Sequence, residues 1–132
     1  MLISRECDYA IRIMRQLADG EKKTTEDICV KERIPTPFAY KILKKLEKSG
    51  FVRSFRGARG GYSLIKDPAV FTLYDIFIAM GEQMELTACL KVDFECPMNP
   101  SGTECGVHKE YIRLQELVFA GMQEKTMQEL LG

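Results

Sequence analysis

The chain has 132 residues, of which 45% are hydrophobic and 29% are charged, and its formal net charge is zero. This length suits one folded domain, with at most a short appendage, and the composition is that of a globular protein. The sequence excludes a membrane-spanning helix, because no stretch approaches about 18 consecutive apolar residues. The N-terminal stretch MLISRECDYA is too charged for a secretory signal, so we expect a cytoplasmic protein.

The neutral total hides two halves of opposite charge. Residues 1–66 hold 15 Lys and Arg against 8 Asp and Glu, whereas residues 67–132 hold 4 against 11. Nine basic residues and a single acidic one lie between Arg33 and Lys66. A basic block of this kind is typical of a protein that binds a polyanion, the alternative being an ordinary solvated, lysine-rich face.

Two helices are predicted ahead of the densest part of this basic block. Apolar side chains recur at helical spacing through residues 3–18, and Asp19 and Gly20 end the run. The segment TTEDICVKER then predicts a shorter helix, with Thr24 or Thr25 as its N-cap and acidic residues in its first turn.

The segment IPTPFAYKILKKLEKSG gives the clearest helix prediction in the chain. Thr36 is the expected N-cap, Pro37 the first helical residue and Gly50 the end of the helix. The face toward the core is formed by Ala39, Ile42, Leu43 and Leu46. The other faces carry Tyr40, Lys41, Lys44, Lys45 and Lys48.

The next segment, FVRSFRGARGGYSLIK, predicts a β-hairpin. Strand-forming residues flank a glycine-rich turn whose tip carries Arg56 and Arg59. The order of helix, short helix, capped basic helix and hairpin predicts a winged helix-turn-helix, a mainly α fold with a small β-hairpin wing. In that fold the third helix fits the major groove of double-stranded DNA, and the wing reaches the neighbouring backbone or minor groove.

Two further helices are predicted after the break at residues 67–68. Thr72 and Asp75 form a capping-box sequence for a helix that ends near Gly81. A fifth helix begins near Gly106, and its apolar stripe is too wide for one small domain to cover. We therefore expect a long C-terminal helix that packs on its own domain and on a partner subunit, with an ordinary core helix as the alternative.

These elements predict three parts of the chain. Residues 1–81 form a winged helix-turn-helix DNA-binding domain, residues 82–105 a cysteine-rich loop, and residues 106–132 a dimerisation helix with a C-terminal helix. The loop is the part whose composition is most unusual. The 20 positions that begin in this loop and end in the first turn of the following helix hold three of the five cysteines and the only histidine, in the spacing Cys-x6-Cys-x8-Cys-x2-His. These residues are Cys89, Cys96, Cys105 and His108.

The number and spacing of the cysteines favour a metal group. Five is an odd number, and cytoplasmic thiols are kept reduced, so a disulfide framework is not expected. Thiolates ligate both iron–sulfur clusters and zinc. If the chain enters a helix at this point, Cys105 and His108 stand at positions i and i+3 and share one face. An iron–sulfur cluster is favoured because zinc sites usually use close Cys-x2–4-Cys pairs, and zinc and metal-free thiols are the alternatives. Cys7 and Cys29, on apolar helix faces, are predicted to be small buried hydrophobes.

Three stretches together resemble a known family. They are DYAIRIM at residues 8–14, ILKKLEKSGFVRSFRGARGGYSL at residues 42–64, and the three-cysteine loop. Over nearly its whole length the chain resembles the Rrf2 family of bacterial transcription regulators. The resemblance implies a homodimer that is held by the long helix after the loop and binds palindromic or near-palindromic DNA.

The resemblance also implies a set of cluster ligands. In cluster-binding members three loop cysteines ligate the iron, and these match Cys89, Cys96 and Cys105. In one type a histidine three residues after the third cysteine completes a 2Fe–2S cluster, and His108 stands at that place. In another type an aspartate near the N-terminus of the partner subunit serves a 4Fe–4S cluster, and Asp8 matches it. We expect the 2Fe–2S cluster with His108, with Asp8 and 4Fe–4S as the alternative.

The DNA contacts are expected to divide by position. Lysines around the third helix supply charge mostly toward phosphates, whereas residues at its N-terminal end face base edges, and Lys41 can also contact guanine. Arg56 matches the family's wing arginine at the minor groove, and Arg59 adds charge at the tip. The expected DNA-binding residues are Thr36, Pro37, Tyr40, Lys41, Lys44, Lys45, Arg56 and Arg59.

The predicted function is therefore a transcription regulator whose operator affinity is controlled by an iron–sulfur cluster that senses iron, redox state, oxygen or nitric oxide. An electron carrier or redox enzyme with the same cluster does not account for the basic block. It would also lack support from a nucleotide-binding motif or a catalytic triad. A winged-helix regulator with a zinc-bound or metal-free thiol loop is the closer alternative.

Overall fold

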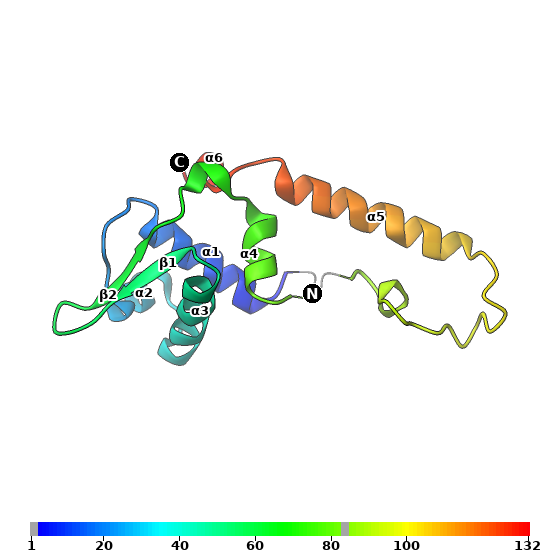
Figure 1. Cartoon of the computed structure of the whole chain (residues 1–132), viewed down its shortest axis with the longest axis horizontal. Coiled ribbons are helices and arrows are strands. Elements are labelled where there is room, and N and C mark those ends of the chain that lie inside the picture. Colours follow the sequence, from blue (N-terminus) through cyan, green and yellow to red (C-terminus); the bar gives the residue numbers. More distant parts are fainter. Residues whose placement is uncertain (1–2, 83–84) are drawn as a thin grey trace.

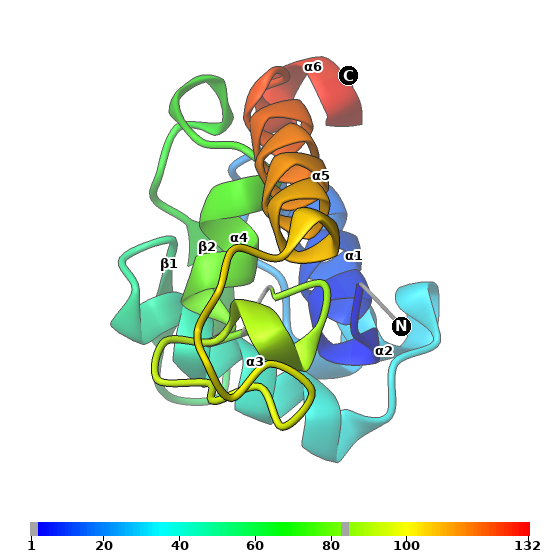
Figure 2. The same cartoon turned by 90° about the vertical axis from the view of Figure 1, so that its right-hand side faces the viewer.

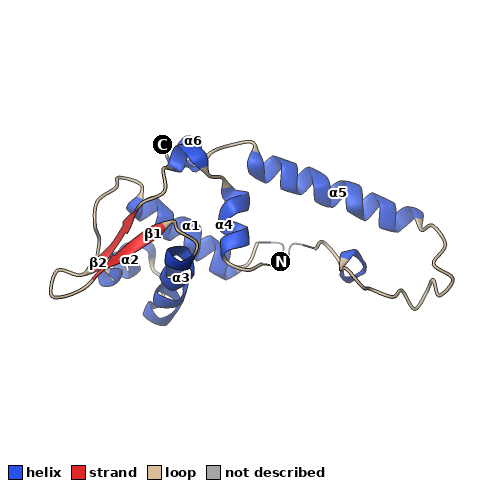
Figure 3. Ribbon diagram, in the orientation of Figure 1, coloured by secondary structure: helices blue, strands red, loops and turns tan. Residues whose placement is uncertain are grey.

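The computed structural model describes residues 3–82 and 85–132, which form a mainly helical body and one long helix that extends from it (Figure 1). The strands make one antiparallel hairpin beside the helices (Figure 3). In neither described range is a helix both long and apolar enough to cross a membrane. The elements are α1 (Arg5–Leu17), α2 (Thr25–Glu32), α3 (Thr36–Lys48), β1 (Val52–Phe55), β2 (Gly61–Leu64), η1 (Pro68–Val70), α4 (Leu73–Ala79), η2 (Ala88–Leu90), α5 (Gly106–Gln123) and α6 (Met127–Leu131).

Side-chain caps set two of the helix starts that the sequence predicts. The Thr24 hydroxyl accepts a hydrogen bond from the Asp27 amide at 3.1 Å, at the start of α2. Thr72 and Asp75 form the predicted capping box of α4, in which the Thr72 amide donates to the Asp75 carboxylate at 2.8 Å. Caps of this kind satisfy amide groups that have no partner within the helix. The predicted starts of both helices are confirmed.

The start of α3 differs from the prediction by one residue. Pro35 is the N-cap, Thr36 is already helical and Pro37 is the second helical residue. The Pro35 carbonyl accepts hydrogen bonds from the amides of Phe38 and Ala39, at 3.0 and 3.1 Å. The ring of Pro35 fixes its φ near −60°, and with ψ at 132° the residue is extended, so the helix begins after it without a hydroxyl cap. The prediction that Thr36 caps α3 is therefore wrong, and its side chain is exposed instead.

One apolar core joins the helices of the body to the hairpin. Helix α1 packs against α2, α3 and α4. The predicted inner face of α3 is confirmed, since its side chains are fully buried: Ala39, Ile42, Leu43 and Leu46. The C-terminal α6 returns to the same core, where Met127 is buried and its amide donates to the Phe71 carbonyl at 2.8 Å. The long helix α5 is thus attached to the body at its C-terminal end.

The hairpin predicted at residues 51–65 is confirmed, with Phe55 opposite Gly61 at its outer end. A second pair of hydrogen bonds holds it to the connection between α1 and α2. The Lys23 amide donates to the Tyr62 carbonyl at 2.9 Å, and the Lys23 carbonyl accepts from the Tyr62 amide at 2.8 Å. The wing therefore has a fixed base on the helical body.

Gly61 is required where this bridge meets the hairpin. Its φ is +148°, and a Cβ there would lie 2.4 Å from the Lys23 carbonyl oxygen. Gly61→Ala should lower the free energy of unfolding by about 3 kcal/mol or more, because backbone strain and a displaced bridge add together. Gly57→Ala is the matched control: it has φ +96° but nothing within 4 Å, and so carries the strain alone. Urea unfolding measures both, and equal losses would show that the Lys23 contact does not hold the wing.

Helix α5 packs on the body along one side only. The Phe119 ring meets Tyr74 of α4 with centroids 5.6 Å apart, and the Gln115 side chain accepts from the Leu86 amide at 3.0 Å. Figure 2 looks along α5 and shows it beside α4. No residue of α5 is buried, and Leu117 is 56% exposed. An apolar face of this helix is therefore left uncovered by residues 3–82 and 85–132 of the same chain.

Candidate nucleic-acid interface and metal centre

The N-terminal end of α3 presents a row of side chains to solvent. The exposed residues are Thr36, Pro37, Phe38 and Tyr40. The Tyr40 hydroxyl donates to the Glu26 carboxylate at 3.2 Å, which holds the ring on the outer surface. Phe38 was missed by the sequence analysis, although an aromatic residue outside the apolar stripe of a helix is a usable signal. Its ring is 48% exposed and packs edge-on against Tyr9, with centroids 6.0 Å apart.

The lysines of α3 differ in their surroundings. Lys44 and Lys48 are exposed, as predicted. The Lys41 ammonium approaches the Glu6 carboxylate at 3.4 Å, and Lys45, which is half-buried, forms an ion pair with the same carboxylate. Lys45 is therefore not the freely solvated cation that its place in the sequence suggests. Glu6, from α1, is a neighbour of this surface that no local pattern reveals.

The positive charge of the wing is not confined to its tip. Arg56 and Arg59 are exposed between the two strands, as predicted. The Arg53 guanidinium lies 4.7 Å from the Phe55 ring centroid, and the Lys22 ammonium lies 5.4 Å from it. Lys22 also donates to the Arg59 carbonyl. It comes from the connection between α1 and α2, and so its contribution to the wing could not be read from the hairpin sequence.

The four predicted metal ligands line one cleft of about 1040 Å³, between the loop and the start of α5. Cys89 lies in η2 and Cys96 in the irregular segment that follows. Cys105 is the N-cap of α5 and His108 lies in its first turn. Cys96 and Cys105 are exposed, and Cys89 is half-buried. The fold thus brings side chains from three separate segments to a single surface.

These donors share the cleft without meeting at metal–ligand distance. Within residues 3–82 and 85–132, no three His, Cys, Asp or Glu side chains approach closely enough to hold one ion. The chemistry of the donors still fits a thiolate-bound group, since three thiols and one imidazole suit iron–sulfur clusters and zinc alike. Cys96 lies in an irregular segment, and its approach to the other donors does not require any helix to unfold.

Asp8, the alternative fourth ligand, lies on α1 and does not line this cleft. Its carboxylate pairs with the Arg12 guanidinium at 2.8 Å, and Arg12 also donates to the Glu32 carbonyl at 3.3 Å. One chain therefore does not bring Asp8 to the loop cysteines. A contribution from Asp8 would have to come from a partner subunit.

The two cysteines outside the loop are structural. Cys7 is fully buried and Cys29 is 8% exposed, as predicted. Burial raises the pKa of the Cys7 thiol to about 12, so it stays protonated at neutral pH. A protonated buried thiol is neither a good nucleophile nor a metal ligand. The candidate metal donors are thus the three cysteines of the loop.

Comparison with known proteins decides the family. Residues 3–132 match the model of the Rrf2 family, which is described as an iron-dependent transcriptional regulator. The chain belongs to the Rrf2 family. A protein of Aquifex aeolicus named as an HTH-type transcriptional regulator is 29% identical over 134 residues, which cover 100% of this chain and 92% of that protein. The HTH-type transcriptional regulator IscR of Vibrio vulnificus is 26% identical over 135 residues, covering 100% and 78%.

The fold agrees with this Rrf2 membership. The solved structure of CymR, titled the global cysteine regulator of B. subtilis, matches with a TM-score of 0.76 over 99% of this chain and 96% of that one. The two are 22% identical, so the likeness shows the fold alone. The predicted winged helix-turn-helix with a β-hairpin is confirmed. The family match and the relatives show that the protein is a transcriptional regulator of the Rrf2 family and not an enzyme, as the sequence predicts.

Proposed function

We propose that this Rrf2 regulator binds double-stranded DNA as a cytoplasmic homodimer, and that an iron–sulfur cluster held by the loop sets its operator affinity. The ligands are Cys89, Cys96 and Cys105, with His108 as the fourth and a 2Fe–2S cluster as the favoured type. The observation that carries this proposal is that all four side chains line one cleft although they span 20 positions. The family description as iron-dependent supports it.

The DNA-binding surface is α3 together with the wing. The exposed end of α3 enters the major groove, where Thr36, Pro37 and Tyr40 face base edges. Lys41, Lys44 and Lys45 supply charge toward phosphates, and Lys41 can also contact guanine. Arg56 and Arg59 of the wing reach the minor groove or the backbone beside it. The exposure of the helix end and the fixed base of the wing support this arrangement.

The homodimer is held by α5. The eighteen residues of this helix include no buried side chain, and the exposed apolar residues on one of its faces need a surface to cover them: Val107, Tyr111, Leu114 and Leu117. A second copy of the same face meets that need with two-fold symmetry, which implies a palindromic or near-palindromic operator. In this proposal residues 1–81 read DNA, residues 82–105 hold the cluster and residues 106–132 form the dimer. Residues 83–84 of the loop lie outside the described residues.

The position of the loop lets its metal state affect the two DNA-binding α3 helices of a dimer. When bound, a cluster cross-links the thiolates of the loop. Cys105 and His108 belong to the N-cap and first turn of α5, so their ligation fixes how the loop enters the dimer helix. At the other end of the loop, Glu82 accepts a hydrogen bond from the Ser4 hydroxyl at the start of α1. A loop held at both ends can bias the two α3 helices of a dimer between two arrangements.

A regulator with zinc-bound or metal-free thiols is the second candidate. Its metal-free form is favoured by the finding that no three candidate ligands within the described ranges stand close enough to hold one ion. The fold is also shared with CymR, whose title names a cysteine regulator. Anaerobic purification followed by an absorbance spectrum and by iron, sulfide and zinc analysis separates the two. Iron and sulfide in equal amounts support the cluster, and zinc alone or no metal supports the second candidate.

A substitution in the wing tests the proposed DNA binding. Arg56→Ala should weaken binding to duplex DNA selected by the wild-type protein. It should also make affinity depend less on salt, because each cation at a phosphate adds about 0.9 to the slope of log affinity against log salt concentration. Lys125→Ala, exposed between α5 and α6, removes the same charge away from the wing and should leave both unchanged. Fluorescence anisotropy across a salt series measures the effect, and unchanged binding by the Arg56 variant would remove the hairpin from the interface.

A further inference from the structure

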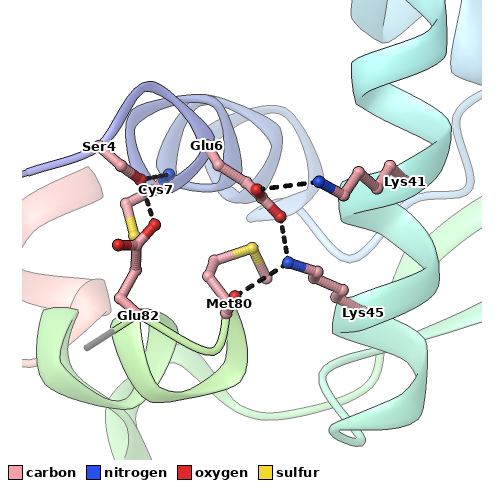
Figure 4. A network of polar contacts seen from close by, with 7 residues as sticks. All are labelled: Ser4, Glu6, Cys7, Lys41, Lys45, Met80 and Glu82. Atoms are coloured by element: carbon pink, nitrogen blue, oxygen red, sulfur yellow. Dashed lines mark hydrogen bonds and ion pairs between the residues drawn. The ribbon is translucent and has the colours of Figure 1, made fainter.

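One carboxylate faces the proposed DNA-binding helix at close range. Glu6, the second residue of α1, forms an ion pair with Lys45 and lies 3.4 Å from the Lys41 ammonium (Figure 4). Its side chain is only 20% exposed, whereas the Lys41 side chain is 60% exposed. Both lysines are among the residues proposed to contact DNA. A single half-buried acid is thus shared by two cations that phosphates would also attract.

The surroundings of Glu6 keep it ionised and keep it in place. Burial works against its charged form, yet the ammonium groups of Lys45 and Lys41 outweigh burial and hold the pKa of the carboxyl below its usual range. Lys45 also donates to the Met80 carbonyl at the C-terminal end of α4, at 2.9 Å. The Lys45 ammonium is therefore held from two directions, by a charge and by a carbonyl.

We propose that Glu6 competes with DNA phosphates for Lys41 and Lys45, and so lowers the affinity of the protein for DNA. A lysine paired with a carboxylate carries little net charge outward, and it must leave that partner before it can neutralise a phosphate. The two lysines then contribute to DNA binding only in complexes in which they leave Glu6 of α1 and contact a phosphate. This inference rests on the proposed DNA-binding function and adds a counter-charge to it.

The same contacts give this competition a route to the cysteine loop. Ser4, two residues before Glu6, is the N-cap of α1 and donates to Glu82, the first residue of the loop. Met80, which accepts from Lys45, lies two residues before Glu82. Figure 4 shows two sets of contacts close together, one around Ser4 and Glu82 and one around Glu6 and Lys45, which are joined through the backbones of α1 and the end of α4. Any change in the loop that moves Glu82 or Met80 therefore acts on the partners of Lys45.

Glu6→Gln tests the proposal because it removes the charge and keeps the size of the side chain. Its affinity for duplex DNA selected by the wild-type protein should rise about fivefold, the effect of two ion pairs of ordinary strength. The log–log salt slope should steepen by about 0.9 for each lysine released to a phosphate. The matched control is Glu124→Gln, which removes the same charge at an exposed position between α5 and α6, away from α3 and the wing. It should change affinity less than twofold, roughly the noise of the assay.

A second pair of variants shows whether Glu6 acts through these lysines. In a Lys41→Gln, Lys45→Gln background, adding Glu6→Gln should have no further effect on affinity or slope. If Glu124→Gln matched the gain of Glu6→Gln, or if the gain persisted in the background without Lys41 and Lys45, general electrostatics would explain it and the proposal would fail. An unchanged or weaker affinity in Glu6→Gln would also overturn it. A wild-type protein that selected no DNA would instead defeat the proposed function, so the two failures are distinguishable.

Discussion

Leu117→Glu should convert the proposed homodimer into a monomer. Leu117 lies on α5, and its side chain is 56% exposed in a single chain, so glutamate there costs the monomer little. In a dimer held by this face the same change loses the burial of an apolar side chain and places a carboxylate in the interface. Each dimer contains the change twice. A loss of about 4 kcal/mol follows, which raises the dissociation constant about a thousandfold.

Sedimentation measures this result directly, because one chain has a mass of 15.1 kDa and a dimer twice that. Gln128→Glu is the control: it adds the same charge at an exposed position of α6, outside the apolar face of α5. Its mass should stay that of the wild type. A Leu117→Glu protein that remained a dimer would place the interface elsewhere. Specific DNA binding should fall together with the dimer, since a monomer reaches only one half-site.

The parts of the fold that the sequence predicts are those set by neighbouring residues. The capping box of Thr72 and Asp75 lies within one helical turn, and so its pattern is visible in four consecutive letters. The buried stripe of α3 follows helical periodicity in the same way. The misplaced cap at Thr36 shows the limit of such local rules. A threonine before a proline predicts a cap, but the conformation of Pro35 starts the helix one residue earlier.

The contacts that the sequence analysis did not predict are those between residues far apart in the chain. Glu6 and Lys45 are 39 positions apart, and Lys22 and Arg59 are 37 apart. No periodicity links them, because their meeting depends on how α1, α3 and the hairpin pack. Sequence reasoning therefore located the basic surface and missed the acid that faces it. At the loop it named the four donors, and the structure adds that they share one cleft.

Replacing loop ligands should have the largest effect on the metal content of the protein. Cys105→Ser should lose nearly all iron and sulfide after anaerobic reconstitution, because a thiolate at the N-cap of α5 is replaced by a poor iron ligand. Cys29→Ser is the matched control: it makes the same chemical change at a buried position outside the cleft and should keep the cluster. Visible spectra with iron and sulfide analysis read both. If Cys89, Cys96 and Cys105 could each be replaced without loss, the loop would not be a metal site.

The fourth ligand is the sharper test, and two substitutions separate His108 from Asp8. His108 lines the cleft with the three cysteines, whereas Asp8 is paired with Arg12 on α1, so His108→Ala should make the cluster labile and Asp8→Ala should leave it intact. His108→Cys should retain the cluster at a lower reduction potential, because a thiolate adds negative charge where imidazole is neutral. Redox titration with visible spectra measures these outcomes. A cluster lost in Asp8→Ala and untouched in His108→Ala would reverse the assignment. Because Asp8 stands away from the cleft within one chain, the site would then have to be completed by the partner subunit.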